Sequence, residues 1–269
     1  MPKEPGWHFE RKAQRCGFVR VAGIDEAGRG PLAGPVVAAA VIFPPGFRMN
    51  GLADSKQLPP ERRRELFHEI HEAAVAVGVG KASAEEIDRL NILTATHLAA
   101  RRAVEALAAP PDYLLTDYLR LAWADVPVEP LVRGDQRCAS VAAASIIAKV
   151  ARDQMMCDHD NDYPGYGFAA HKGYGTAAHL AALHTLGPTT IHRLTFRGVV
   201  WFDTQLRRSK TFEYLAEVIE AIENEQTARL VRVALSGAAA RLPERELDEI
   251  EALFASRLGQ LGVAWASCP

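Results

Sequence analysis

The chain has 269 residues, 48% of them hydrophobic, which suffices for one large domain or for one domain with an appendage. Its net charge of −2 excludes the strongly basic composition of a generic nucleic-acid binder. Residues 211–269 hold five Arg and ten Asp or Glu, whereas residues 1–210 carry a balance of +3, so any nucleic-acid contact must come from a local patch.

The first 17 residues mix basic side chains with Trp7 and Phe9, and we expect a short helix or arm that packs on the body. This segment has no apolar core of the signal-peptide kind, and no window reaches the ~18 uninterrupted apolar residues of a membrane span. The four cysteines form no CxxC pair, which favours reduced thiols. We therefore predict a cytoplasmic protein without a membrane partner.

An apolar run, two adjacent acids and a second apolar run predict a β-hairpin. The runs span residues 18–24 and 36–43, and Asp25 and Glu26 follow the first run directly. Successive strand residues point to opposite faces, so we expect Glu26 at a strand end or at a bulge. Two acids at a buried strand end repel each other unless a cation is present, and the pattern therefore indicates a metal site.

Gly28, Arg29 and Gly30 come immediately after these acids. Glycines on both sides of an arginine let backbone N–H groups and a guanidinium approach a phosphate or a sugar closely. The triplet alone is a weak signal, but its position behind paired acids indicates a substrate-binding loop.

Ser55 and Lys56 precede a helical run over residues 61–76. They could hold a phosphate, and a polar loop that caps a helix is an equally natural interpretation. A strand over 75–80 and a long helix over 84–109 are predicted next, the helix beginning after Ser83 as N-cap. Asn91 lies beside the apolar face of this helix, where a buried amide bonded to backbone is the simpler interpretation.

Two further acids, like the first pair, come at or after the ends of apolar runs that predict strands. Asp117 ends the run 113–117, and Asp135 follows the run 126–132 just before a helix predicted over 138–160. A carboxylate at a helix start is favoured by the helix dipole. Carboxylates without thiols or imidazoles select a hard cation.

The helix over 138–160 opens with many small side chains, which predict close packing against a sheet. Lys149 could face a phosphate, although a solvated helix surface is the ordinary interpretation. The following loop, residues 163–176, interleaves glycines with aromatic residues and suits stacking on sugars or bases. Four histidines lie in and after this loop: His171, His179, His184 and His192. No second group of ligands stands at metal spacing, so we do not expect zinc.

The segment 211–269 has helix-patterned runs over 212–222 and 244–261. A helical hairpin, a partner-binding surface and a partly disordered tail are all compatible with these runs.

These motifs resemble bacterial ribonuclease HII, a family that cuts the RNA strand of RNA–DNA hybrids and nicks duplex DNA at embedded ribonucleotides. The resemblance is carried by residues 25–35, by Gly134-Asp135, by 142–150 and by the Lys172-Gly-Tyr174 turn, and it stops near Phe202. It implies an α/β fold with a ribonuclease H-like mixed β-sheet flanked by helices. We expect this catalytic domain over residues 1–210, with an acidic helical C-terminal extension over 211–269.

The resemblance implies two divalent ions, Mn²⁺ or Mg²⁺, held roughly 3.5–4 Å apart for in-line phosphoryl transfer. Their ligands and the catalytic groups would be four acids: Asp25, Glu26, Asp117 and Asp135. Cleavage would fall on the 5′ side of the ribonucleotide and leave 3′-hydroxyl and 5′-phosphate ends. The family often has a small residue after the third acid, where this chain has Tyr118.

Other positions are implied to bind substrate. Gly28, Arg29 and Gly30 would read the 2′-hydroxyl, and Tyr174 would check that the next sugar is deoxyribose. The remaining substrate contacts would come from Ser55, Lys56, Asn91, Lys149 and Lys172. We expect a monomer, with the extension available to a partner.

Two alternatives remain open at this stage. Another nuclease or recombinase of the same fold would share the acids but would need neither the glycine-arginine loop nor Tyr174. A non-catalytic hybrid-binding module would keep the basic patch and would have no use for clustered acids.

Overall fold

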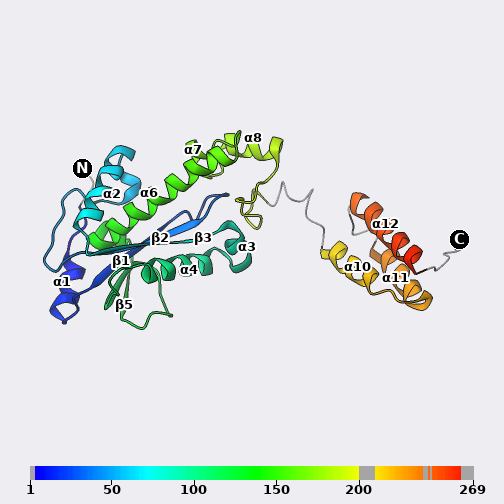
Figure 1. Ribbon diagram of the computed structural model, residues 1–269, viewed down its shortest axis with the longest axis horizontal. Helices are drawn as coiled ribbons and strands as arrows, with labels where there is room; N and C mark the ends of the chain where they lie inside the picture. Colours follow the sequence, from blue (N-terminus) through cyan, green and yellow to red (C-terminus); the bar gives the residue numbers. More distant parts are fainter. Residues whose placement is uncertain (1–3, 200–209, 239–241, 243, 262–269) are drawn as a thin grey trace. The chain divides into compact units, whose positions relative to one another are not determined.

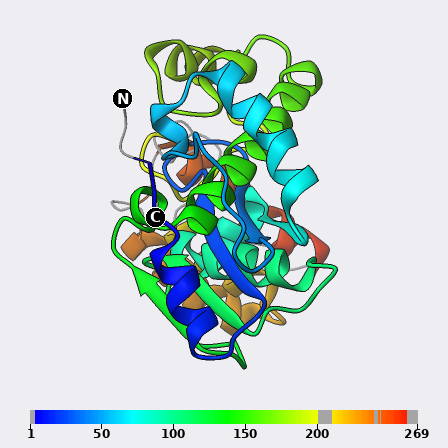
Figure 2. The ribbon, with the colours of Figure 1, turned by 90° about the vertical axis from the view of Figure 1, so that its left-hand side faces the viewer.

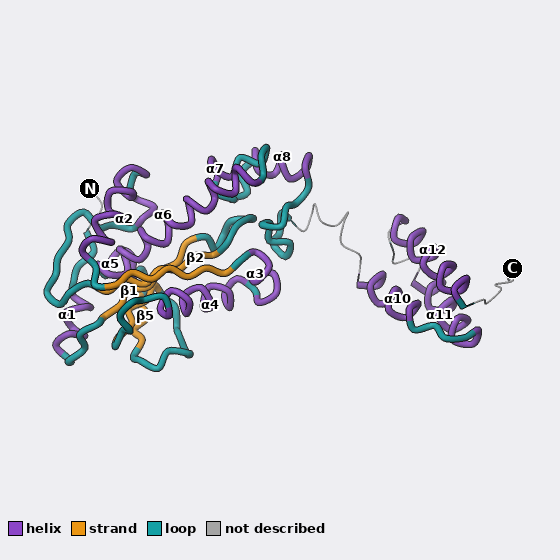
Figure 3. Tube along the Cα trace, in the orientation of Figure 1, coloured by secondary structure: helices purple, strands orange, loops and turns teal. Residues whose placement is uncertain are grey.

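The hairpin predicted around the paired acids forms the centre of a five-stranded mixed sheet. The computed structural model describes residues 4–199, 210–238, 242 and 244–261, and the chain divides into two compact units, residues 1–202 and 203–269. The strands are β1 (Val21–Ala27), β2 (Val36–Ile42), β3 (Ala76–Ala82), β4 (Tyr113–Asp117) and β5 (Val128–Leu131). Their order is β3-β2-β1-β4-β5, with β1, β4 and β5 parallel and β2 antiparallel to both its neighbours. Figure 3 shows the strands in orange between purple helices.

Helices cover both faces of this sheet. In the first unit they are α1 (His8–Arg15), η1 (Ser55–Gln57), α2 (Pro60–Ala73), α3 (Ala84–Leu90), α4 (Ile92–Glu105), α5 (Gly134–Arg137), α6 (Ala139–Asp162), α7 (Phe168–His171) and α8 (Ala177–Leu186). Helix α4 packs on one face and α6 on the other (Figure 1). Figure 2 shows α1 in dark blue at the front and α2 in cyan beside α6. The predicted mixed sheet flanked by helices is confirmed.

Strand β2 lies between the two helical layers, and its residues are small and apolar on both faces. Ala38 and Ala40 belong to the core under α4, whereas Ala39 and Val41 belong to the core under α6. A Cβ on Gly23 of β1 would overlap the backbone of α6. The close packing predicted from the small residues of α6 is therefore confirmed.

The long helix predicted over 84–109 is wrong, because Asn91 divides it into α3 and α4. Asn91 has φ +69°, which no α-helix accepts, and its side chain accepts a hydrogen bond from the Thr94 N–H at 3.1 Å. It is thus the N-cap of α4. Ser83 caps α3 as expected and forms a capping box with Glu86. The apolar face continued through the break, so periodicity alone did not reveal it.

The described part of the second unit contains three helices, α10 (Lys210–Glu220), α11 (Glu225–Ala238) and α12 (Glu244–Gln260), around an apolar core of its own. A helical extension is confirmed, but the helical hairpin is wrong because α11 was not anticipated. The boundary predicted at residue 210 adjoins residues 200–209, which lie outside the described ranges, and the division of functions stays a prediction. Among the described helices, none is both long and apolar enough to cross a membrane.

Candidate active site

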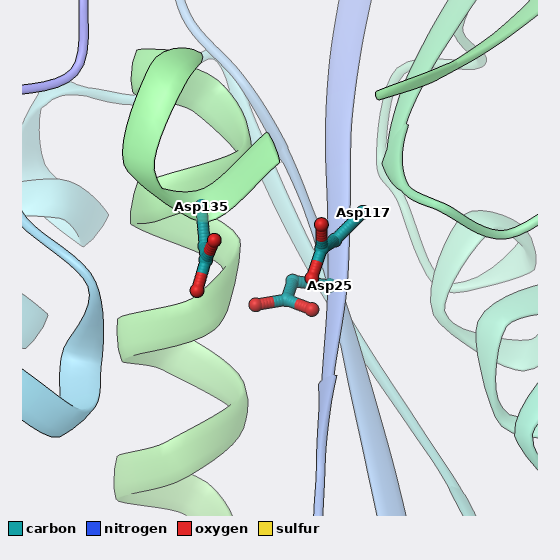
Figure 4. A group of neighbouring side chains, drawn as sticks. All are labelled: Asp25, Asp117 and Asp135. Atoms are coloured by element: carbon teal, nitrogen blue, oxygen red, sulfur yellow. The ribbon is translucent and has the colours of Figure 1, made fainter. Parts of the chain in front are cut away.

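Three aspartates from distant parts of the chain meet at the end of the parallel strands. Asp25 lies on β1, Asp117 ends β4 and Asp135 lies in α5. The register pairs Ile24 with Thr116, so the residues that follow them, Asp25 and Asp117, come side by side. Carboxylate oxygens of the three aspartates lie within 4.8 Å of one another (Figure 4). The topology therefore builds a compact group of oxygen ligands.

Burial and mutual repulsion disfavour the charged forms of these carboxyl groups. The pKa of Asp25 is raised well above its ordinary value, first by burial and then by the negative charges of Glu26 and Asp117. Burial and Asp117 also raise the pKa of Asp135. Asp135 precedes the long helix α6 as expected, and it lies inside a short helix, α5, that was not predicted. A divalent cation among these oxygens would reverse the penalty.

Glu26 does not join the group of three aspartates. It lies one residue before the end of β1 and pairs in regular register with Ala38, so the strand has no bulge here. One carboxylate oxygen, Oε1, accepts a hydrogen bond from Arg29 at 3.2 Å. The other, Oε2, is buried and has no hydrogen-bond partner in the described part of the chain. Burial raises the pKa of Glu26, and Arg29 opposes the shift. A buried oxygen left without a partner fits a missing cation.

The Gly28-Arg29-Gly30 loop is held from below by a buried arginine. The Arg193 guanidinium donates to the carbonyl of Gly28 at 2.5 Å, to that of Arg29 at 3.0 Å and to that of Gly34 at 2.8 Å. Its side chain is fully buried, and burial lowers its pKa to about 9. Arg193 thus fixes the backbone of the loop, while the side chain of Arg29 is exposed to solvent.

A second buried arginine joins the segment that follows this loop to the segment that carries Tyr174. Arg152 of α6 donates to the carbonyl of Pro35 at 2.9 Å and to that of Lys172 at 3.0 Å. Tyr174 is 46% exposed, and a Cβ built on Gly30 would lie 3.8 Å from the Cε1 atom of its ring. The residues predicted to recognise the sugars, Gly30 and Tyr174, therefore lie opposite each other, and the missing side chain of Gly30 keeps the space between them open.

The Ser55-Lys56 segment lies beside the acid group. The Ser55 hydroxyl shares a 2.8 Å hydrogen bond with that of Ser145, which in turn opposes the raised pKa of Asp25. The exposed Lys56 carries a positive charge that opposes the raised pKa of Asp135. Asp54, whose side chain accepts from the Lys56 N–H at 3.0 Å, is a buried acid close enough to raise the pKa of Asp135. The segment thus caps η1, not the predicted helix α2, and it borders the acids, whereas its contact with a phosphate stays a prediction.

Other predicted substrate contacts are engaged within the protein. Lys149 forms a 2.5 Å ion pair with Asp153 one turn along α6, and burial lowers its pKa. The Lys172 ammonium donates to the Ala169 carbonyl and lies 3.3 Å from Cys157 Sγ. The exposed Asn91 side chain caps α4. Contact of these three residues with substrate stays a prediction.

Sequence reasoning missed Asp54, Ser145 and the role of the two buried arginines. Asp54 and Ser145 lie inside motifs that were noted, and their positions in the chain carry no separate sign of contact with the site. Arg152 and Arg193 bind main-chain carbonyls, which leave no trace in side-chain patterns. Tyr118 has φ +60°, a conformation that favours glycine. The family often has a small residue at this position, so the backbone is strained where this chain has a tyrosine instead.

Comparison with known proteins decides which family uses this site. The model of the Ribonuclease HII family matches residues 22–199. This chain belongs to the ribonuclease HII family. The ribonuclease HII of Geobacter sulfurreducens is 57% identical over 198 residues, which cover 74% of this chain and 91% of that protein. That of Moorella thermoacetica is 54% identical over 189 residues, covering 70% and 92%.

Solved structures agree with this membership. The ribonuclease H2 of Pyrococcus horikoshii has a TM-score of 0.59 at 26% identity and covers 71% of this chain and 100% of its own. Ribonuclease HII of Archaeoglobus fulgidus, solved as a complex with PCNA, has a TM-score of 0.56 at 25% identity, covering 66% and 96%. Bst-RNase HIII, solved with Mn²⁺, shares the fold at 21% identity and a TM-score of 0.53, covering 70% of each chain.

As a ribonuclease HII the chain is a hydrolase that acts on the RNA strand of RNA–DNA hybrids. Ribonucleases H use divalent metal ions, and the three aspartates supply the oxygen ligands such ions prefer. The expectation drawn from the motifs is confirmed, and the alternatives of another nuclease class or a non-catalytic module fall away. The second unit lies beyond the residues that the family model matches.

Proposed function

We propose that this ribonuclease HII cuts on the 5′ side of ribonucleotides embedded in duplex DNA, with two Mg²⁺ or Mn²⁺ ions as cofactors. The observation that supports this proposal is the meeting of Asp25, Asp117 and Asp135 oxygens within 4.8 Å. Glu26 completes the ligand set through its unpartnered Oε2. When bound, the ions supply an activated water and stabilise the leaving 3′-oxygen.

The chain's own residues bind and orient the strand. The loop Gly28–Gly30 approaches the ribose closely because two of its residues lack side chains, and Arg29 offers donors to the adjoining phosphate. Tyr174 faces this loop and packs against the following sugar, where a 2′-hydroxyl would clash with the ring. Lys56 adds positive charge beside the acids, which attracts the phosphodiester.

A duplex DNA that carries one ribonucleotide tests this proposal. With Mg²⁺ or Mn²⁺ we expect a single nick that leaves 3′-hydroxyl and 5′-phosphate ends. Asp25→Asn should lower kcat by more than about 100-fold while hybrid binding persists, because losing a first ligand exceeds the 10–100-fold effect of outer contacts. If this variant were as active as the wild type, the three aspartates would not be the catalytic metal site.

The reader residues need a separate comparison. Arg29→Ala and Tyr174→Ala should lower the preference for the ribonucleotide junction over a continuous hybrid. If both variants still cut only at the junction, other residues select the substrate.

We further propose that the protein is a cytoplasmic monomer whose C-terminal unit binds a partner protein. Helix α11 exposes Leu230 and Val233 by 68% and 73%, an apolar pair at helical spacing. The Archaeoglobus ribonuclease HII was solved in complex with PCNA, which gives a partner protein a precedent among the structural neighbours.

A further inference from the structure

Three imidazoles lie behind the loop that carries Tyr174. His179 and His192 are 0% and 2% exposed, and their Nε2 atoms lie 3.0 Å apart. The rings of His171 and His179 stack with their centroids 4.4 Å apart. Three imidazoles in a core are unusual, because apolar side chains would fill the same space without the burial of polar nitrogens.

Backbone partners assign the proton of each ring. His192 Nδ1 accepts from the Thr189 N–H at 2.8 Å, so the His192 proton is on Nε2 and points at His179. His179 Nε2 is then an acceptor, and its proton is on Nδ1, which donates to the Tyr174 carbonyl at 2.9 Å. The result is one directed chain of hydrogen bonds that ends on the backbone of Tyr174.

His171 fixes the other side of the same turn. Its Nδ1 accepts from the Gly173 N–H at 3.1 Å, and its Nε2 donates to the Tyr166 carbonyl at 2.8 Å. The Tyr174 N–H donates to the His171 carbonyl at 2.9 Å. Both backbone groups of Tyr174 are therefore bound, while its ring stays exposed opposite Gly30.

We propose that His179 and His192 are positioning residues for substrate selection. They hold the Tyr174 carbonyl, and so keep the Tyr174 ring at the distance from Gly30 where it checks the sugar after the ribonucleotide. This inference rests on the proposed function, because it assigns Tyr174 to that check. Holding a contact group to within an ångström is worth up to about 100-fold in rate.

Paired substitutions at His179 test the proposal in the full chain. His179→Leu removes the side-chain donor to the Tyr174 carbonyl and leaves the Thr176 N–H, which donates to the same oxygen at 2.8 Å, whereas His179→Asn keeps an amide N–H near the place of Nδ1. We expect His179→Leu to lower kcat/KM at a single embedded ribonucleotide by about 10–100-fold, with a much smaller loss on a continuous hybrid. The Asn variant should restore most of the preference. His184→Leu, an exposed position on the same helix α8, is the matched control and should leave the preference unchanged.

A double-mutant cycle separates positioning from a general effect on folding. In a Tyr174→Ala background, His179→Leu should cause no further loss of junction preference. A loss as large as in the wild-type background would overturn the proposal, since the histidine would then act on the fold alone. If His179→Leu unfolds, His192→Gln, which keeps a donor toward His179, and His192→Leu take its place in the cycle.

Imidazole ¹⁵N chemical shifts give a readout independent of activity. The proposal requires a protonated Nδ1 in His179 and a protonated Nε2 in His192 at neutral pH. The opposite tautomers would overturn it. A wild-type enzyme that shows these tautomers but no junction preference would instead contradict the proposed function.

Discussion

At the scale of single residues, the site is a place where burial and charge oppose each other. Asp25 is 5% exposed and shares its surroundings with the charges of Glu26 and Asp117, which raise its pKa. A carboxylate in this position destabilises the metal-free protein, because it has lost water without gaining a cation. The same repulsion becomes attraction when a divalent ion binds. The acids are therefore retained for chemistry at the expense of stability.

Asp25→Asn should accordingly stabilise the metal-free protein while it removes activity. We expect the free energy of unfolding in EDTA to rise by on the order of 1 kcal/mol, because a neutral amide replaces a repelled acid. Urea titration measures this change. Asp125→Asn, at an exposed acid outside the group, should leave the free energy within about 0.5 kcal/mol. A destabilised Asp25→Asn protein would show that the carboxylate is satisfied in some other way.

At the scale of elements, the substrate loop is shaped by segments far away in the chain. Arg193, after α8, donates to its Gly28 and Arg29 carbonyl groups, and Arg152, on α6, donates to the Pro35 carbonyl shortly after the loop. Gly28 has φ +96°, and a Cβ there would overlap the Arg152 side chain and come 2.8 Å from the Pro35 carbonyl oxygen. Glycine is thus required at this position for two reasons: its backbone has a positive φ, and the Arg152 side chain occupies the space of a Cβ.

Gly28→Ala should be far more harmful than the same change at a comparable glycine. Gly17 has φ +94° and nothing within 4 Å of its would-be Cβ, so Gly17→Ala isolates the backbone penalty. We expect about 1 kcal/mol of destabilisation at Gly17, and about 2–4 kcal/mol with loss of hybrid cleavage at Gly28. Thermal unfolding and a hybrid cleavage assay measure both. Equal effects at the two positions would mean that the Arg152 side chain can move away from a Cβ at position 28 at little cost.

At the scale of the whole molecule, two groups of titratable residues act on stability in opposite directions as the pH falls. Burial lowers the pKa of His192 from 6.5 to about 4, and burial also lowers the pKa of His179. As the pH falls below 6.5, these histidines become protonated in the unfolded chain but stay neutral in the folded protein. The free energy of unfolding therefore decreases. The aspartates, whose pKa values are raised, bind protons more readily when folded and oppose this decrease.

The histidine contribution can be isolated by comparing wild type with His192→Gln. Between pH 6.5 and 4 the wild type should lose on the order of 3 kcal/mol more than the variant, since each pKa unit corresponds to about 1.4 kcal/mol. Urea titrations in EDTA across this range measure the difference. Parallel pH profiles for the two proteins would show that His192 titrates normally in the folded state.

The second unit has an apolar core built from its own residues, and every proposed site residue lies in the first unit. A chain that ends at residue 202 should therefore keep kcat/KM for hybrid cleavage within about twofold of the full chain. Steady-state cleavage of both forms measures this. A larger loss would assign part of substrate binding to residues 203–269.

Much of the fold and part of the site could be predicted because they depend on neighbours in sequence. The hairpin, the strand that ends in Asp117 and the cap at Ser83 follow from alternation and local hydrogen bonding. Asn91 was misjudged because a positive φ leaves the apolar pattern of a helix unchanged. Helix α11 was missed although its buried residues, Ala228, Val231 and Leu235, recur at helical spacing, so the sequence did carry its signal.

The sequence by itself determined that acids lie near the ends of apolar strands and that an arginine flanked by glycines follows the first pair. Only the tertiary structure decided that Asp25, Asp117 and Asp135 converge while Glu26 turns to Arg29. The reason is that strand order and register join residues about 90 positions apart, and no local pattern encodes that pairing. The arginine contacts to main-chain carbonyls and the histidine tautomers were hidden likewise, because every residue type offers the same carbonyl.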